Sequence, residues 1–176
     1  MDTYVLLFRG INVGGKNILP MKDLVNILEA MDYSKVRTYI QSGNAVFCSK
    51  KKCNKNTARE IGSKIHKNHG FEPKVLLLGV ADLEKSIDEN PFDEADGKSV
   101  HFYFLETRPE KPDLEKIQSL KAESEEYRLL DRVYYLYAPD GIGRSKLASA
   151  VEKHLGVTTT ARNLNTVRKL AALANQ

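Results

Sequence analysis

The chain has 176 residues, 41% of them hydrophobic and 28% charged, a composition that is typical of globular proteins and unlike that of disordered ones. The net charge of +4 is unevenly divided, because residues 1–80 carry 13 basic and 6 acidic side chains whereas residues 81–176 carry 14 and 17. No stretch approaches the roughly 18 consecutive apolar residues that a membrane span requires, and acidic Asp2 with the early Arg9 argues against a signal peptide.

Residues 1–80 predict the element order β-α-β-β-α-β. Strands are expected at residues 4–11, 35–41, 45–49 and 74–78, and helices after Pro20 and after the basic loop 50–55. Proline suits the first helical turn because its missing N–H has no partner there, and Gly70 is a suitable helix stop. The turn Ser42-Gly43-Asn44 joins the second and third strands. This order is that of the split, ferredoxin-like motif.

Residues 98–176 repeat the same order. Strands are expected at residues 100–106, 127–130, 133–137 and 157–160, and helices at 113–123, at 146–155 and from about 165. Residues 81–97 predict a connector, formed by a short helix that ends before Pro91 and an acidic stretch at 93–97. The sequence therefore predicts an α+β protein of two tandem ferredoxin-like units, residues 1–80 and 98–176, with an extra C-terminal helix.

The loop at residues 10–17 matches the phosphate-binding pattern G-x-x-x-x-G-K up to its last position. Asn17 stands where that pattern needs a hydroxyl for Mg²⁺, and Pro20 starts the helix too late to present its amides to a phosphate, so we do not expect an NTPase. Consecutive amides at Gly14 and Gly15 can still form an anion-binding nest, with Arg9 and Asn12 close by. The alternative is a loop that merely reverses the chain.

Two further polar segments stand out. Ser42 and Asn44 flank a glycine in a turn that by itself needs no function. Residues 158–166 contain Arg162 and Asn163 among threonines, and one polar side chain there is expected to cap the last helix. Helix amides beside Arg162 would suit a phosphate or a carboxylate, whereas the competing interpretation is a polar network that ties the helix to the first unit.

Thiols and imidazoles give no sign of a metal centre. Cys48 and Cys53 form a single C-x₄-C pair without a second half, so free thiols and a cytoplasmic location are expected. His66 and His69 lie three residues apart on a helix, but no third ligand accompanies them, and no metal site is predicted.

Five segments in one order carry a family resemblance: residues 7–15, 39–44, 90–92, 143–146 and 160–166. On these the chain resembles a widespread family of domains of unknown function. The resemblance implies an α+β protein of two ferredoxin-like units, and no activity, cofactor or catalytic residue comes with it. Members often have tryptophan where this chain has Leu164, so any stacking by that ring is in doubt here.

The sequence favours a cleft between the two units that binds an anionic small molecule such as a nucleotide or phosphate ester. The candidate ligands are Arg9, Asn12, Gly14, Gly15, Ser42, Asn44, Arg162 and Asn163. No acid–base pair is evident and Ser42 is the only candidate nucleophile, which favours binding over catalysis; no cofactor or oligomeric state is indicated.

Two alternatives stay open. The first is single-stranded nucleic-acid binding through the basic loop 50–55 and the aromatic side chains Phe102, Phe104, Tyr135 and Tyr137, although aromatics on strands usually pack in a core. The second is a structural or interaction protein without a ligand.

Overall fold

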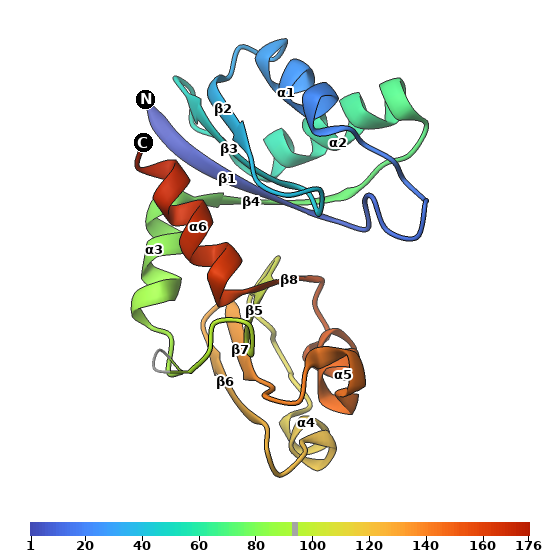
Figure 1. Ribbon diagram of the computed structural model, residues 1–176, viewed down its shortest axis with the longest axis vertical. Helices are drawn as coiled ribbons and strands as arrows, with labels where there is room; N and C mark the ends of the chain where they lie inside the picture. Colours follow the sequence, from blue (N-terminus) through green and yellow to red (C-terminus); the bar gives the residue numbers. More distant parts are fainter. Residues whose placement is uncertain (93–94) are drawn as a thin grey trace. The chain divides into compact units, whose positions relative to one another are not determined.

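The structure, a computed structural model, describes residues 1–92 and 95–176. It has a mixed α+β fold with two four-stranded antiparallel sheets, and the described residues form six α-helices (Figure 1). The predicted α+β class is confirmed. The chain divides into a first unit, residues 1–85 and 169–176, and a second unit, residues 86–168. No helix in the described ranges combines the length and apolar character that crossing a membrane requires.

The first unit is built around a central buried strand. Its elements are β1 (Asp2–Arg9), α1 (Met21–Glu29), β2 (Ser34–Thr38), β3 (Asn44–Ser49), α2 (Lys55–His69), β4 (Lys74–Gly79) and the first part of α3 (Val80–Asp88). The strand order is β2-β3-β1-β4, and every neighbouring pair is antiparallel. Residues 4–8 of β1 are all buried, as the continuous apolar run predicted.

Helices α1 and α2 cover one face of this first sheet (Figure 1). Helix α2 begins at Asn54, whose side chain accepts from the Asn56 N–H at 2.8 Å, while the Thr57 hydroxyl accepts from the Asn54 N–H at 3.2 Å. It ends at Gly70, which has a left-handed backbone. The apolar sides of both helices meet the sheet in one core, which includes Leu6, Phe8, Leu24, Leu28, Phe47, Ile61 and Ile65.

The second unit has the same connectivity. It contains β5 (Val100–Leu105), α4 (Leu114–Leu120), β6 (Glu126–Leu130), β7 (Val133–Tyr137), a short 3-10 turn (Ile142–Arg144), α5 (Lys146–Leu155), β8 (Thr159–Asn163) and the start of α6 (Leu164–Ala174). Its strand order is β6-β7-β5-β8, again antiparallel throughout. The ring of Tyr134 lies at the centre of its core, 5.8 Å from Tyr103 and 5.4 Å from Tyr127 between ring centroids.

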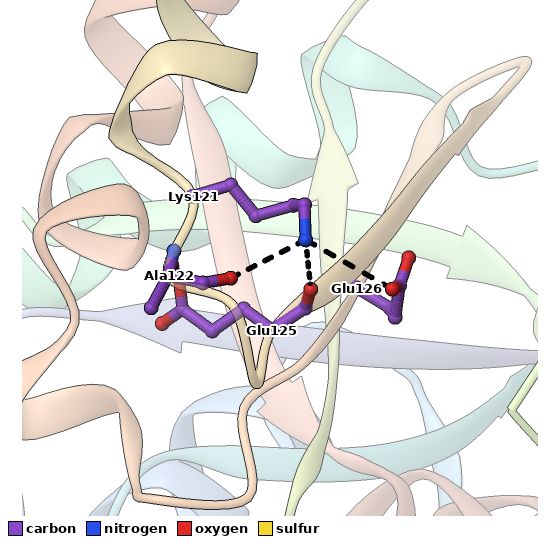
Figure 2. Close-up of polar contacts among 4 residues, drawn as sticks. All are labelled: Lys121, Ala122, Glu125 and Glu126. Atoms are coloured by element: carbon purple, nitrogen blue, oxygen red, sulfur yellow. Dashed lines mark hydrogen bonds and ion pairs between the residues drawn. The ribbon is translucent and has the colours of Figure 1, made fainter.

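A lysine holds the turn between α4 and β6, as Figure 2 shows. The Lys121 ammonium donates to the Ala122 carbonyl at 3.3 Å and to the Glu125 carbonyl at 2.6 Å. It also lies 3.9 Å from a carboxylate oxygen of Glu126. The buried Glu125 carboxylate accepts from the Ala122 N–H at 2.9 Å. Hydrogen bonds among residues 121–125 therefore hold the turn in place.

Some element boundaries differ from the predicted ones. The predicted helix 113–123 has its aspartate cap, since Asp113 accepts from the Lys116 N–H at 3.0 Å, but it ends at Leu120 because the following turn closes on Glu125. The last strand runs to Asn163, so α6 follows it without a loop. Of the predicted break at 93–97, residues 93 and 94 lie outside the described residues.

Candidate functional site

Two of the three predicted polar segments meet in the first unit. The Phe8 N–H donates to the Gly43 carbonyl at 2.9 Å, and the Asn12 side chain donates to the Gln41 carbonyl at 2.8 Å. A methyl group at Gly43 would come within 2.5 Å of the Ile11 side chain, so the turn lies directly against the loop that follows β1. Residues 10–17 and 42–44 therefore form one local structure, although they are far apart in sequence.

Asn12 and Asn44, in these two segments, donate their side-chain amide hydrogens to groups within the protein. Asn12 uses both, on the carbonyls of Gln41 and Leu19, and its side-chain oxygen accepts from the Leu19 N–H at 2.8 Å. Asn44 is fully buried and donates to the Tyr39 carbonyl at 3.0 Å and to the Ser42 hydroxyl at 3.1 Å. An amide nitrogen has two hydrogens to donate, so neither side chain has one left for a ligand.

The exposed part of the same loop keeps its donors. Gly14 and Gly15 have left-handed backbones, with φ of 59° and 72°. Within the described part of the chain neither N–H has a hydrogen-bond acceptor. Arg9 and Lys16 are exposed nearby. Helix α1 begins only at Met21, as the position of Pro20 predicted, so no amides of that helix lie at the Gly15-Lys16 step.

Arg162 and Asn163 belong to the second unit, on β8. The Asn163 side chain accepts from the Thr166 N–H at 2.9 Å and thus caps α6, the role that the sequence predicted for one residue of this segment. Arg162 is half-buried and donates to the Ala161 carbonyl at 2.7 Å. Burial lowers the pKa of Arg162 to about 10, which leaves it cationic at neutral pH.

A lysine-rich hollow, which the sequence did not reveal as a pocket, lies elsewhere in the first unit. We call it the lysine pocket. Its volume is about 790 Å³, and it is lined by residues 30–34, residues 49–53 and three side chains of α2: Thr57, Glu60 and Lys64. The cationic groups are Lys50, Lys51, Lys52 and Lys64, against the two carboxylates of Asp32 and Glu60. In the described ranges none of these four lysines makes an ion pair, so the pocket carries a surplus of positive charge.

The backbone beneath these lysines is fixed at both ends. The buried Ser49 hydroxyl donates to the Lys51 carbonyl at 2.7 Å and accepts from the Lys51 N–H at 3.1 Å. Farther along, the Cys53 N–H donates to the hydroxyl of buried Tyr4 at 3.1 Å. Lys50, Lys51 and Lys52 are themselves exposed. A loop ordered in advance loses less entropy when it binds a ligand.

Tyr33 supplies the aromatic part of the lining. Its ring centroid lies 4.4 Å from that of Phe47, which belongs to the core. Burial, together with the nearby Cys53 and Glu60, raises the pKa of Tyr33 to about 12. The phenol therefore stays protonated at neutral pH and offers an uncharged hydroxyl beside the lysines.

Most of the aromatic side chains that the sequence suggests for base stacking are buried in the second unit. Phe102 and Tyr135 have no exposed surface, and their ring centroids lie 4.8 Å apart in an edge-to-face arrangement. The Tyr135 hydroxyl donates to the Ser86 carbonyl at 2.8 Å. Phe104 is also buried. These three rings are core side chains, whereas Tyr137 is half-buried with its ring centroid 6.0 Å from that of Phe92.

Comparison with known proteins agrees with the fold and supplies no activity. A family described as "Protein of unknown function (DUF1697)" matches residues 1–135. The chain is also similar to the solved structure of a conserved bacterial protein, SP0830 from Streptococcus pneumoniae. That similarity has a TM-score of 0.69 at 25% identity and covers 98% of each chain. No curated protein matches the sequence.

Proposed function

Because the chain belongs to the DUF1697 family, for which no function is established, we propose its function from geometry: the first unit binds an anionic small molecule in the lysine pocket. The ligand class is a nucleotide or a phosphate ester. The observation that carries the proposal is a pocket of about 790 Å³ whose four lysines make no ion pair with any residue that the structure describes. Pockets for small ligands typically measure about 300–1,000 Å³.

The charge of this pocket comes from side chains and not from a helix end. At the start of α2 the Asn54 side chain accepts from the Asn56 N–H and the Thr57 hydroxyl accepts from the Asn54 N–H. Part of the backbone N–H groups at this helix end therefore already have acceptors within the protein. Lysine ammonium groups act as flexible point charges that suit phosphate oxygens. At about 4 Å, near a protein surface, a unit charge pair interacts by roughly 4 kcal/mol before desolvation.

The glycine loop supports a second position for the same ligand class. The exposed Gly14 and Gly15 amides, with Arg9 and Lys16 beside them, resemble a small anion nest. Ser42 and Arg162 stay candidates for contact with a ligand, whereas Asn12, Asn44 and Asn163 are assigned to holding loops and a helix in place.

We also assign the ferredoxin-like arrangement to each unit. The support is the strand order β2-β3-β1-β4 in the first and β6-β7-β5-β8 in the second, antiparallel throughout. Two buried free thiols, Cys48 and Cys53, support the expected cytoplasmic location.

The test is a thermal-shift and calorimetry comparison of nucleoside mono-, di- and triphosphates on the full chain. Binding at a free ligand concentration of 100 times Kd stabilises a protein by about 2.7 kcal/mol, so a ligand is detectable as a rise in Tm. We expect Lys51→Ala and Lys64→Ala to weaken binding several-fold. The matched control is Lys111→Ala, an exposed lysine of the second unit.

The outcomes separate the two positions. Loss of binding in Arg9→Ala with full binding in Lys64→Ala would move the site to the glycine loop. If no phosphate compound shifts the wild-type Tm, the chain does not bind this ligand class, and the interaction-protein alternative takes its place.

A further inference from the structure

A second basic hollow adjoins the lysine pocket. It has a volume of about 410 Å³ and is lined by Met31, Arg59, Glu60, Ser63, Lys64 and Lys67. Met31, Glu60 and Lys64 line both hollows, so the two hollows are neighbours on the surface of the first unit. The second hollow adds two cations, Arg59 and Lys67, and no further carboxylate.

Four of the residues that line the two hollows lie on one side of helix α2. Thr57, Glu60, Lys64 and Lys67 follow one another at three- and four-residue steps and so lie on one side of the helix. Another side of the helix, which includes Ala58, Ile61 and Ile65, is buried in the core. From Arg59 to Lys67, the first and last basic residues of α2 that line the two hollows, the helix rises by about 12 Å at 1.5 Å per residue. The basic side chains therefore extend well beyond the reach of one phosphate group.

We propose that the two hollows form one basic track that binds the backbone of a single-stranded nucleic acid. This rests on the proposed function, because it extends the ligand of the lysine pocket from one phosphate compound to a chain of them. A span of about 12 Å exceeds the roughly 3.4 Å of duplex axis between successive phosphates of one strand several-fold, so the track can contact more than one phosphate. The Debye length at physiological salt is about 8 Å, so a phosphate at one end is largely screened from cations at the other.

The track contains no exposed stacking platform of the kind that reads bases. Tyr33, the aromatic side chain of the lining, is half-buried against Phe47. Recognition through lysines and one arginine is therefore expected to be electrostatic and independent of base sequence.

Glu60 lies where the two hollows meet, and its carboxylate opposes a polyanion that passes along α2. Removing this charge is expected to tighten binding. Glu60→Gln keeps the size of the side chain, so a gain in affinity reports charge and not a change of shape.

The experiment measures the affinity of the full chain for oligothymidylates of increasing length, with thymidine triphosphate and inorganic polyphosphate as comparison ligands. Affinity should rise with length until the strand spans the track, and the slope of log K against log salt should be roughly −0.7 per phosphate contacted. Arg59→Ala and Lys67→Ala should each weaken the long oligonucleotides several-fold and leave thymidine triphosphate unchanged. Lys51→Ala should weaken both, Glu60→Gln should strengthen the long ligands, and Lys111→Ala should change neither.

The possible failures are distinguishable. Nucleotide binding without any dependence on length, or with no effect of Arg59→Ala and Lys67→Ala, overturns the track and keeps the small-molecule pocket. Binding of polyphosphate without binding of oligonucleotides overturns the nucleic-acid assignment. Absence of binding to every phosphate compound overturns this inference and the proposed function together.

Discussion

The side-chain nitrogen of Asn12 donates to the carbonyl of Gln41 at 2.8 Å and thereby joins the loop after β1 to the turn before β3. The same side-chain amide also donates to the Leu19 carbonyl and accepts from the Leu19 N–H. One side chain thus satisfies three backbone groups in two segments that are far apart in the sequence. A polar residue that looks like a ligand in the sequence is a structural brace.

We expect Asn12→Ala to lower the free energy of unfolding by about 1–3 kcal/mol, because it leaves partly buried backbone groups without partners. Chemical denaturation measures the change. Asn68→Ala is the control, since Asn68 is exposed on α2 and should change stability by less than about 0.5 kcal/mol. Equal stability of the two variants would show that the brace contributes nothing.

Gly43 and Gly14 make a matched pair for the same region. Both have left-handed backbones, with φ of 82° and 59°, so an alanine at either is strained by about 1–2 kcal/mol. Only at Gly43 would the added methyl also lie 2.5 Å from the Ile11 side chain and 2.7 Å from Phe8 Cβ. Overpacking adds about 1–3 kcal/mol. Gly43→Ala should therefore lower Tm clearly more than Gly14→Ala; a similar loss in both would mean that the turn yields to the methyl.

Much of the fold is legible in the sequence because its signals are local. The apolar run at the start of the chain became the buried strand β1, and Gly70 and Gly156 end α2 and α5 in left-handed backbones, as helix stops do. The end of α4 was not legible, because it depends on Glu125 turning back to accept from the Ala122 N–H. Glu125 is one of several acidic residues in this stretch, so the sequence does not show which of them accepts that hydrogen bond.

The candidate site was legible only in part. The basic loop was visible as a run of lysines, but the pocket also needs Tyr33 and Lys64, which only the packing of α1 and α2 brings to that loop. The sequence predicts Asn12 and Asn44 as ligands because it cannot show whether a side-chain amide finds its hydrogen-bond partner within the chain. In the third polar segment the last strand extends past its predicted end at residue 160, because β5 pairs with residues 159–163.

Lys121 offers a test of the turn in Figure 2. Its ammonium donates to two backbone carbonyls, and its side chain is only 17% exposed. Lys121→Met keeps much of the apolar stem and removes the donors, so we expect a loss of about 1–2 kcal/mol in the free energy of unfolding. The control is Lys116→Met on the exposed side of α4. If both substitutions have the same effect, the two hydrogen bonds do not stabilise the turn.

His101 should make the second unit sensitive to mild acid. It lies in the buried strand β5, where burial lowers the pKa of its imidazole; a hydrogen bond with the backbone of Lys98 acts in the opposite direction and is the weaker effect. The unfolded chain, with an ordinary histidine pKa near ~6.5, therefore binds more protons than the folded one as the pH falls below that value. Stability is fully present above this pH and is lost below it, at up to about 1.4 kcal/mol per pH unit until the lower folded-state pKa is reached.

The measurement is the free energy of unfolding at several pH values between neutral and mildly acidic, for wild type, His101→Gln and the exposed control His66→Gln. Glutamine cannot be protonated in this range, so His101→Gln should flatten the loss of stability on acidification, whatever it does to stability at neutral pH. His66→Gln should keep the wild-type dependence. An unchanged pH dependence in His101→Gln would mean that other groups carry the acid sensitivity, and that the buried imidazole is protonated as easily in the folded chain as in the unfolded one.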